Sequence, residues 1–267
     1  MSLKELPIGL FDSGVGGISV LLEAQELLPQ EDFLYLADQK NFPYGEKTGK
    51  EIKKLALENV GFLLKKGCKL VVIACNTATI QAISLLRKKF PQTPFVGVVP
   101  VVKPASRETK TGHLAILSTT STSKSRFFWQ LMDQYASKRT VYNLTCPGLV
   151  ELIEKGILEG EAVISKLKIC LAPALEDPLV DIFASGCTHF PLIRESVLKV
   201  AGRKIRFITP DRPVARQVKN ILEKRGLKVE KKKKGKVVFF TTADPRAFSK
   251  VATRLLGTKV VSKKVSL

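Results

Sequence analysis

Short runs of consecutive apolar residues alternate along the chain with longer segments in which apolar residues recur every three or four positions. Runs this short are typical of strands buried on both faces, and segments with the longer period, such as 17–28, 50–65 and 76–89, are typical of amphipathic helices. The predicted strands lie near residues 7–11, 33–37, 69–74, 95–99, 113–117, 139–143, 179–184 and 205–208. This alternation predicts an α/β fold whose mainly parallel sheets are flanked by helices.

The chain is long enough for two such sheets. Its 267 residues, 45% of them hydrophobic, can form two lobes of about 100 to 150 residues each. Prolines at positions 94, 100 and 104 indicate a crossover between the lobes. We expect two similar lobes, one formed by residues 1–98 plus 207–267 and the other by residues 99–206. Because ligands bind beyond the carboxyl ends of the strands in open parallel sheets, we expect the active site in the cleft between the two lobes.

Two of the predicted strands end in a cysteine that is followed by hydroxyl, amide or imidazole side chains. The first segment is Val71–Thr79, Val-Val-Ile-Ala-Cys-Asn-Thr-Ala-Thr, and the second is Leu179–His189, Leu-Val-Asp-Ile-Phe-Ala-Ser-Gly-Cys-Thr-His. A helix is predicted to begin directly after each cysteine, and the free amides of a helix N-terminus favour a thiolate. We therefore predict a chemical role for Cys75 and Cys187, which we expect to face each other across one small substrate.

Composition argues against several classes of protein. The five cysteines are odd in number and contain no CxxC pair, which does not suggest a secreted disulfide framework or a four-ligand zinc site. We expect Cys68, Cys146 and Cys170 to be inert buried side chains. The first eleven residues do not form an ordinary signal peptide, and no apolar run approaches the roughly 18 to 20 residues of a spanning helix. We expect a soluble cytoplasmic protein with no membrane partner.

The net charge of +20 is concentrated near the C-terminus. Residues 203–267 contain 20 lysines and arginines but only four acidic residues, a net charge of +16. The favoured interpretation is a solvated, lysine-rich face with Lys231–Lys234 as a surface loop. Nucleic acid or a DNA-associated partner is a secondary alternative for this basic C-terminal region, because neither an aromatic platform nor a recognition-helix motif accompanies the charge.

A glycine-rich turn follows the first predicted strand, in the sequence Asp12-Ser13-Gly14-Val15-Gly16-Gly17. Its glycines allow a tight turn with exposed amides, and Asp38 lies near the distance expected of a ribose-binding acid in a dinucleotide site. However, Ser19 occupies the position of the third small residue, and the Asp12 carboxylate would repel a pyrophosphate. We therefore favour amino-acid binding over a structural turn, and a structural turn over dinucleotide binding.

Two further polar turns are weaker signals. The turn Asn41-Phe42-Pro43-Tyr44-Gly45 can present backbone amides and a phenol to a ligand, although such a turn alone is more often only a turn. The hydroxyl cluster at 119–122 can cap a helix or bind a carboxylate with the same groups.

Three kinds of chemistry compete for the two cysteines. A cysteine hydrolase would pair one thiol with a base such as His189 and would leave the second cysteine turn unexplained. A dithiol redox enzyme would need the two sulfurs to bond, and the chain has no CxxC pair. Proton transfer alone uses both turns, since one thiolate removes the α-proton of a chiral carbon and the other thiol returns a proton from the opposite face. The ordinary thiol pKa of about 8.5 suits both tasks.

Six motifs support the third chemistry. They are Asp12-Ser13-Gly14-Val15-Gly16-Gly17, Pro43-Tyr44-Gly45, Ala74-Cys75-Asn76-Thr77-Ala78-Thr79, Gly97-Val98-Val99-Pro100, Cys146-Pro147-Gly148-Leu149-Val150-Glu151-Leu152-Ile153-Glu154 and Gly186-Cys187-Thr188-His189-Phe190-Pro191-Leu192-Ile193. Together and in this order, they closely resemble the motifs of the glutamate racemase family, part of the aspartate/glutamate racemase superfamily. The resemblance implies an isomerase that needs no cofactor and supplies D-glutamate for peptidoglycan and cell-wall biogenesis.

The same resemblance implies roles for individual residues. Cys75 and Cys187 match the positions of the family's two catalytic bases. By the same resemblance, Asp12 assists proton movement near Cys75 and His189 assists it near Cys187. Glu154 resembles the family's auxiliary acid. The implied substrate-binding residues are Asp12, Ser13, Pro43, Tyr44, Gly45, Cys75, Asn76, Thr77, Thr119, Thr122, Thr188 and His189. No metal is expected, because Cys187 and His189 are only two candidate ligands in one stretch and zinc requires three or four.

Several alternatives stay open at this stage. An aspartate or hydantoin racemase would use the same pair of cysteines, and a non-catalytic amino-acid or nucleic-acid binding protein would keep the fold without turnover. Glutamate is the expected small-molecule partner, and a homodimer is one of the assemblies that the sequence leaves open.

Overall fold

The structure is a computed structural model that describes residues 2–202, 204–230 and 233–267. Lys231 and Lys232 of the predicted surface loop lie outside the described residues. The chain divides into a first unit, residues 1–98 and 211–267, and a second unit, residues 99–210. The expected boundary after residue 206 cuts strand β8 (Arg206–Ile208), which pairs with β7 and therefore places residues 207–210 in the second unit.

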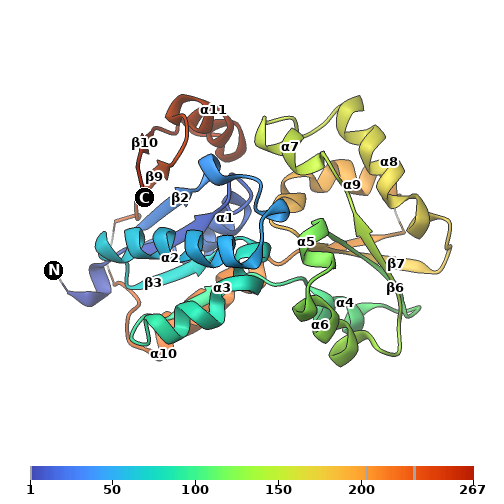
Figure 1. Cartoon of the computed structure of the whole chain (residues 1–267), viewed down its shortest axis with the longest axis horizontal. Helices are drawn as coiled ribbons and strands as arrows, with labels where there is room; N and C mark the ends of the chain where they lie inside the picture. Colours follow the sequence, from blue (N-terminus) through green and yellow to red (C-terminus); the bar gives the residue numbers. More distant parts are fainter. Residues whose placement is uncertain (1, 203, 231–232) are drawn as a thin grey trace. The chain divides into compact units, whose positions relative to one another are not determined.

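The first unit is built on a six-stranded parallel sheet in the order β10-β9-β2-β1-β3-β4 (Figure 1). The strands are β1 (Ile8–Asp12), β2 (Phe33–Ala37), β3 (Leu70–Ile73), β4 (Phe95–Gly97), β9 (Val237–Thr241) and β10 (Ser262–Lys264). The helices are α1 (Ile18–Leu27), α2 (Gly49–Lys65), α3 (Asn76–Lys89), α10 (Asp211–Lys224) and α11 (Pro245–Leu256), with the short 3-10 turns η1 (Leu3–Glu5), η2 (Gln39–Asn41) and η3 (Tyr44–Glu46). Helix α2 packs beside α3, and α1 packs beside α10 and α11.

The second unit is built on a four-stranded parallel sheet in the order β6-β5-β7-β8. Its strands are β5 (His113–Ser118), β6 (Thr140–Thr145), β7 (Val180–Gly186) and β8. The helical segments are α4 (Val102–Glu108), α5 (Thr120–Ser123), α6 (Arg126–Ala136), α7 (Leu149–Glu154), α8 (Glu161–Leu175), η4 (Phe190–Ile193) and α9 (Arg194–Ala201). Helix α8 packs beside both α7 and α9, and α4 packs beside α6.

The central strands are buried because each lies inside a sheet that is covered by helices. Every residue of β1 and β3 is buried, and β7 is buried in all but one position, as the continuous apolar runs predicted. The eight expected strands are all present, and the predicted α/β fold with two parallel sheets flanked by helices is confirmed. No helix in the described part of the chain is both long and apolar enough to cross a membrane.

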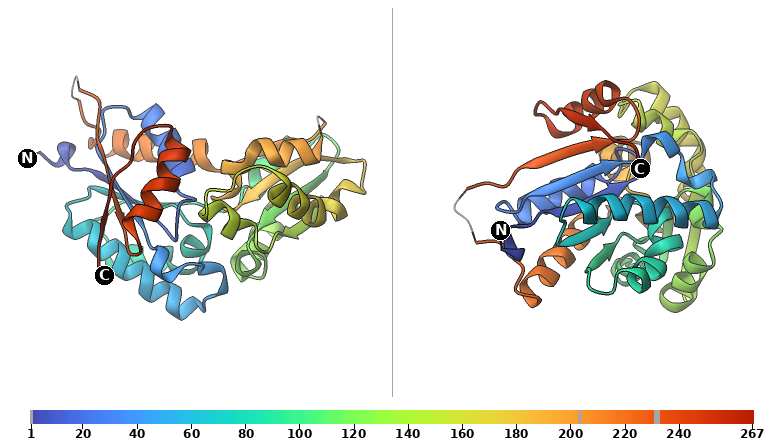
Figure 2. Two further views of the ribbon diagram at one scale, coloured as in Figure 1. Left: turned by 90° about the horizontal axis from the view of Figure 1, so that it is seen from above. Right: turned by 60° about the vertical axis from the view of Figure 1, so that its left-hand side comes forward.

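Two strands were not predicted. Strand β9 pairs with β2, so a segment near the end of the chain lies beside one near its start (Figure 2). Its apolar run, Val-Val-Phe-Phe, was detectable but directly follows the lysine-rich segment. Strand β10 is short and polar, and only its pairing with β9 makes it a strand.

The prediction that Cys146 and Cys170 are inert buried side chains is wrong, because the two are bonded to each other. The two residues form a disulfide with an S–S distance of 2.07 Å, because α8 brings Cys170 beside the turn that follows β6. Their sequence separation of 24 matches no motif that would have revealed the pair. Cys68 is a buried free thiol as expected, and burial raises its pKa to about 12.

Candidate active site

Three neighbouring strands of the first unit end in the polar turns that the sequence analysis identified. Strand β1 leads into Asp12 and Ser13, β2 leads to the turn around Tyr44, and β3 leads to Cys75. Since parallel strands place their carboxyl ends at one edge of the sheet, these side chains gather there.

Cys75 begins the helix α3. It is the N-cap residue, with extended backbone angles of φ −118° and ψ 122°, and its carbonyl accepts a hydrogen bond from the amide of Thr79 at 2.9 Å. The Thr79 hydroxyl in turn donates to the carbonyl of Ile73 at 3.0 Å, which fixes the strand end against the helix start. The thiol is 6% exposed and lies at the amino end of a 14-residue helix, where a negative charge is favoured.

The first glycine-rich turn holds Asp12 and Ser13 close to this thiol. The Ser13 Oγ lies 3.8 Å from the Cys75 Sγ, and Asp12 Oδ1 accepts a hydrogen bond from the Gly14 amide at 2.7 Å. A side chain at Gly17 would come within 2.8 Å of the Ala74 Cβ, so only glycine allows the turn to approach the strand that leads to Cys75.

Asn76 is the strongest indication of a ligand in the first unit. Its side chain is buried, and neither its Oδ1 nor its Nδ2 has a hydrogen-bond partner among the described residues. Buried polar groups are almost always satisfied, so a free amide next to Cys75 is suited to the polar groups of a substrate. Thr77, the next residue, is also buried.

The hydroxyl of Tyr44 is held by a buried carboxylate that the sequence analysis considered only as a ribose-binding acid. Asp38 Oδ2 accepts a hydrogen bond from the Tyr44 hydroxyl at 2.5 Å and from Asn59 Nδ2 at 3.2 Å. Asn41 Nδ2 donates to both oxygens of Asp38, and the Thr242 hydroxyl donates to its Oδ1 at 2.9 Å. With both oxygens engaged and the residue fully buried, Asp38 does not match the free ribose-binding acid of a dinucleotide site.

This network sets the state of the phenol. Burial first, and then the charge and hydrogen bond of Asp38, raise the pKa of Tyr44 far above its ordinary value, and negative charge at Cys75 and Asp12 adds to the effect. Tyr44 is therefore a neutral hydrogen-bonding group near Cys75. The supporting roles of Asp38, Asn59 and Thr242 were missed, since Thr242 is 204 residues from Asp38 in the sequence.

The second cysteine turn differs from the prediction. Strand β7 ends at Gly186, and Cys187 is followed by the 3-10 turn η4 rather than by an α-helix, so the expected helix N-terminus at this thiol is absent. Helix α9 begins only at Arg194. Pro191 at the start of η4 has no amide hydrogen, which is consistent with a short turn here. The Ser185 hydroxyl donates to the Cys187 carbonyl at 2.7 Å and fixes the turn instead.

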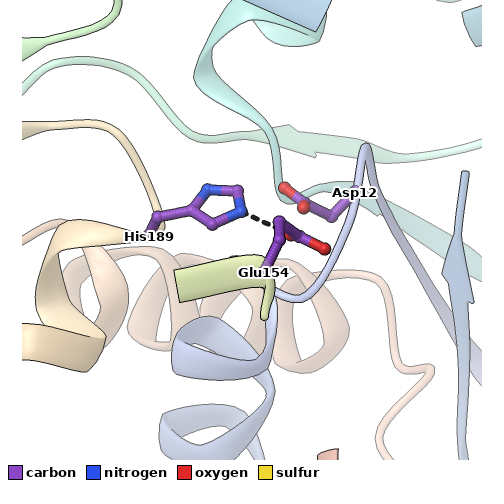
Figure 3. Close-up of side chains that lie close together, drawn as sticks. All are labelled: Asp12, Glu154 and His189. Atoms are coloured by element: carbon purple, nitrogen blue, oxygen red, sulfur yellow. Dashed lines mark hydrogen bonds and ion pairs between the residues drawn. The ribbon is translucent and has the colours of Figure 1, made fainter. Parts of the chain in front are cut away.

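The Cys187 thiol lies beside the imidazole of His189 instead of a helix N-terminus. His189 Nδ1 lies 3.6 Å from the Cys187 Sγ. His189 Nε2 lies 2.7 Å from Glu154 Oε1 at the end of α7 (Figure 3). Burial alone would lower the pKa of His189, but the hydrogen bonds to Cys187 and Glu154 and the negative charge of both groups raise it well above 6.5. A cationic imidazole at this position places a positive charge beside the Cys187 thiol.

The remaining predicted residues of the second unit lie at strand ends as well. Thr119 follows β5 and caps α5, where its Oγ1 accepts a hydrogen bond from the Thr122 amide at 3.3 Å and donates to the Thr122 hydroxyl at 3.1 Å. Helix capping, one of the two predicted uses of this cluster, is thus confirmed. Thr188 is buried beside Cys187. That Cys75 and Cys187 face each other stays a prediction.

Comparison with known proteins finds relatives that all belong to one family. A family model described as Asp/Glu/hydantoin racemase matches residues 19–217. A curated glutamate racemase from Clostridium perfringens is 40% identical over 257 residues, which cover 96% of this chain and 98% of the relative. The crystal structure of glutamate racemase isoform RacE1 from Bacillus anthracis superposes with a TM-score of 0.88 at 29% identity and covers 99% of this chain and 98% of that chain.

A second solved structure, Escherichia coli glutamate racemase in complex with L-glutamate and the activator UDP-MurNAc-ala, superposes with a TM-score of 0.86 at 32% identity. The match covers 98% of this chain and 99% of that chain. The similarity thus extends over both units rather than over one motif.

Proposed function

The chain belongs to the Asp/Glu/hydantoin racemase family, and on that premise we propose that Cys75 and Cys187 are the two acid–base groups that invert the α-carbon of glutamate. Its activity is the racemisation of glutamate, an isomerase reaction that supplies D-glutamate for peptidoglycan synthesis. The observation that carries the two-base proposal is the pair of buried free thiols that follow the strands β3 and β7.

The reaction needs one proton removed and one proton added. One cysteine, as a thiolate, takes the α-proton of L-glutamate and becomes a thiol, and the other thiol donates its proton to the opposite face of the carbanion-like intermediate and becomes a thiolate. Starting from D-glutamate, the two cysteines exchange these tasks. Fixed donors around the substrate carboxylate offset the charge that develops in the transition state.

The surrounding residues prepare each thiol and hold the substrate. Asp12 assists proton movement near Cys75, and His189, oriented by Glu154, assists it near Cys187. The residues proposed to bind the amino and carboxylate groups are Asp12, Ser13, Pro43, Tyr44, Gly45, Cys75, Asn76, Thr77, Thr119, Thr122, Thr188 and His189. The unsatisfied amide of Asn76 supports its place in this set.

The proposed reaction requires neither pyridoxal phosphate nor a metal ion, because the two thiols supply both proton-transfer steps. Activity should therefore survive dialysis against a strong chelator. Loss of racemisation on chelation, with recovery on adding back one metal, would contradict this part of the proposal.

The test uses L-glutamate and D-glutamate separately in deuterium oxide, with wild type and the Cys75→Ala and Cys187→Ala variants. Wild type should interconvert the enantiomers with deuterium at the α-carbon, measured by proton NMR and chiral chromatography. Each variant should lose racemisation by at least about a thousandfold. Each should still exchange the α-proton of one enantiomer only, and the two variants should exchange opposite enantiomers.

Other outcomes would redirect the proposal. Exchange of the same enantiomer by both variants would exclude two opposed bases. Exchange of aspartate or a hydantoin in place of glutamate would change the substrate but not the chemistry. Absence of any exchange, with glutamate still bound, would favour a non-catalytic binding protein.

Partners and location form the final part of the proposal. We place the enzyme in the cytoplasm and propose a homodimer, to be tested by light scattering. Nucleic acid binding by the basic region 203–267 stays a secondary hypothesis, tested by racemase activity and DNA retention after neutralising Lys231–Lys234.

A further inference from the structure

A disulfide joins the turn before α7 to the middle of α8. Cys146 directly follows β6, Cys170 lies within α8, and their Cα atoms are 5.4 Å apart. The loop that this bond closes contains all of α7, whose last residue is Glu154. The disulfide therefore restrains both flanks of the segment from which Glu154 contacts His189.

Helix α7 is short, so its orientation depends on its packing against α8 and η4. It has six residues, fewer than an isolated helix needs, and it is bordered by Gly148 at φ 75° and Gly156 at φ 76°. Two apolar side chains, Leu149 and Ile153, anchor it in the core. Rotation about that anchor would move the Glu154 carboxylate at the end of the helix away from its partner.

We propose that Cys146 and Cys170 are positioning residues for the racemisation, and that their disulfide holds α7 in the orientation in which Glu154 Oε1 accepts a hydrogen bond from His189 Nε2. This inference rests on the proposed function, because that function gives His189 and Glu154 their role near Cys187. The disulfide takes no part in the reaction at the α-carbon. It determines how firmly His189 and Glu154 are held beside Cys187.

The bond can be opened while the catalytic thiols stay as they are. Cys146 is buried and Cys170 is half-buried, so Cys170 offers the more accessible sulfur to a small dithiol. Dithiothreitol supplies two electrons and two protons, becomes a cyclic disulfide, and converts Cys146 and Cys170 into two thiols. Cys75 and Cys187 are free thiols before and after this step.

The chain has only two histidines, which allows a direct measurement on the imidazole. Nitrogen-15 NMR of the ring nitrogens during a pH titration would follow His189 and His113 in unreduced protein, in dithiothreitol-treated protein and in the Cys170→Ala variant, with His113→Gln for assignment. Cys187 and Glu154 are two titratable groups that contact the His189 ring. Reduction should lower the pKa of His189 and leave the titration of His113 unchanged.

Kinetics should follow the same change. Reduction should lower kcat by about three- to tenfold, since a small displacement of a positioned group is enough for such a loss. The alkaline limb of the pH–rate profile should move to lower pH. Cys170→Ala should behave like reduced wild type and should not respond to dithiothreitol, which provides the matched control for effects of the reductant elsewhere.

Several results would overturn the proposal. Unreduced protein, once denatured, should show three reactive thiols of the five cysteines, and a count of five would remove its basis. An unchanged His189 titration and pH profile after reduction, with only a lower unfolding temperature, would make the bond purely structural. An equal response to dithiothreitol in Cys170→Ala would place the effect elsewhere. Absence of glutamate racemisation in every sample would refute the proposed function, whereas the NMR titration would still decide the role of the disulfide.

Discussion

The two cysteine turns share a plan but differ in the groups that lie near the thiol. Each turn follows a buried parallel strand, and near each thiol a proton-bearing ring is held by a carboxylate: Tyr44 by Asp38 at 2.5 Å, and His189 by Glu154 at 2.7 Å. The pKa of both rings is raised. A raised pKa keeps the phenol of Tyr44 protonated and therefore neutral, and it keeps the imidazole of His189 protonated and therefore cationic.

The backbone that follows each cysteine offsets this difference in charge between the two rings. Cys75 caps a 14-residue helix whose amides and dipole favour negative charge, so a neutral phenol suffices beside it. Cys187 has only a 3-10 turn after it, and the positive charge of His189 replaces the helix. If both thiols act as bases, as proposed, backbone dipoles prepare one of them and a side-chain cation prepares the other.

The largest effect should come from removing the side-chain partner of Cys187. His189→Gln should lower kcat/KM by about 100-fold, because a charged hydrogen bond is lost at a buried site. Ser13→Ala should lower it by about threefold, because the Ser13 Oγ and the Cys75 Sγ are 3.8 Å apart and their contact is weak. Enantiomers have equal free energies, so kcat/KM must fall equally in both directions for every variant.

The primary α-deuterium isotope effect should distinguish proton transfer at Cys75 from proton transfer at Cys187, which kcat/KM alone cannot do. His189→Gln slows the step at Cys187, so the primary α-deuterium effect on kcat/KM should rise for the enantiomer that Cys187 deprotonates and fall for the other. Ser13→Ala should show the opposite pattern. His113→Gln, which removes a histidine–carboxylate pair of similar geometry at the start of β5, is the control and should change neither. Parallel changes for both enantiomers in His189→Gln would break the assignment of His189 to one thiol.

The same comparison shows which features the sequence can reveal. The apolar runs of β3 and β7 directly predicted strands that deliver Cys75 and Cys187 to strand ends, because burial on both faces leaves an uninterrupted pattern. The motifs also named His189 and Glu154 as candidates, and the structure shows these two side chains 2.7 Å apart. The helix expected after Cys187 was wrong, since the local pattern at Thr188–Ile193 fits a 3-10 turn as well as an α-helix until the packing around Pro191 is known.

Features that depend on long-range packing were not predictable. The hydrogen bond between Thr242 and Asp38 requires the pairing of β9 with β2, and the Cys146–Cys170 bond requires the docking of α8 on β6. Neither leaves a periodic or spaced signal in the sequence. The spacing of Asp38 from the glycine-rich turn suggested a ribose-binding acid, whereas the structure shows that it accepts hydrogen bonds from Asn41, Tyr44, Asn59 and Thr242.

A smaller effect should come from changing Asp38, the carboxylate that holds the hydroxyl of Tyr44. Asp38→Asn keeps the size of the side chain but places an amide donor where the Tyr44 hydroxyl or the Thr242 hydroxyl now donates, so we expect about a tenfold loss in kcat/KM. Asn41→Ala removes one donor and leaves the Asp38–Tyr44 bond, and it should cost less. Steady-state kinetics with both enantiomers would measure this. Wild-type kinetics in Asp38→Asn, together with impaired Tyr44→Phe, would mean that other contacts suffice to hold the phenol.

The smallest effect should appear in stability as a function of pH. The pKa of His189 is raised in the folded protein, so its charge contributes stability that is complete below about pH 6.5 and is lost as the pH rises through the folded pKa. The pKa of Tyr44 is also raised, but from an ordinary value near 10, so the turn of Cys75 should lose stability only above about pH 10.

Urea unfolding of wild type, His189→Gln and Tyr44→Phe at pH 6, 7.5, 9 and 10.5 would separate the two windows. Between pH 6 and 9, wild type should lose about 1 to 2 kcal/mol more than His189→Gln, and Tyr44→Phe should follow wild type. Above pH 10, Tyr44→Phe should lose less than wild type. If His189→Gln and wild type fell in parallel from pH 6 to 9, the imidazole would not be the cationic partner that replaces a helix at Cys187, and the contrast between the two turns would fail.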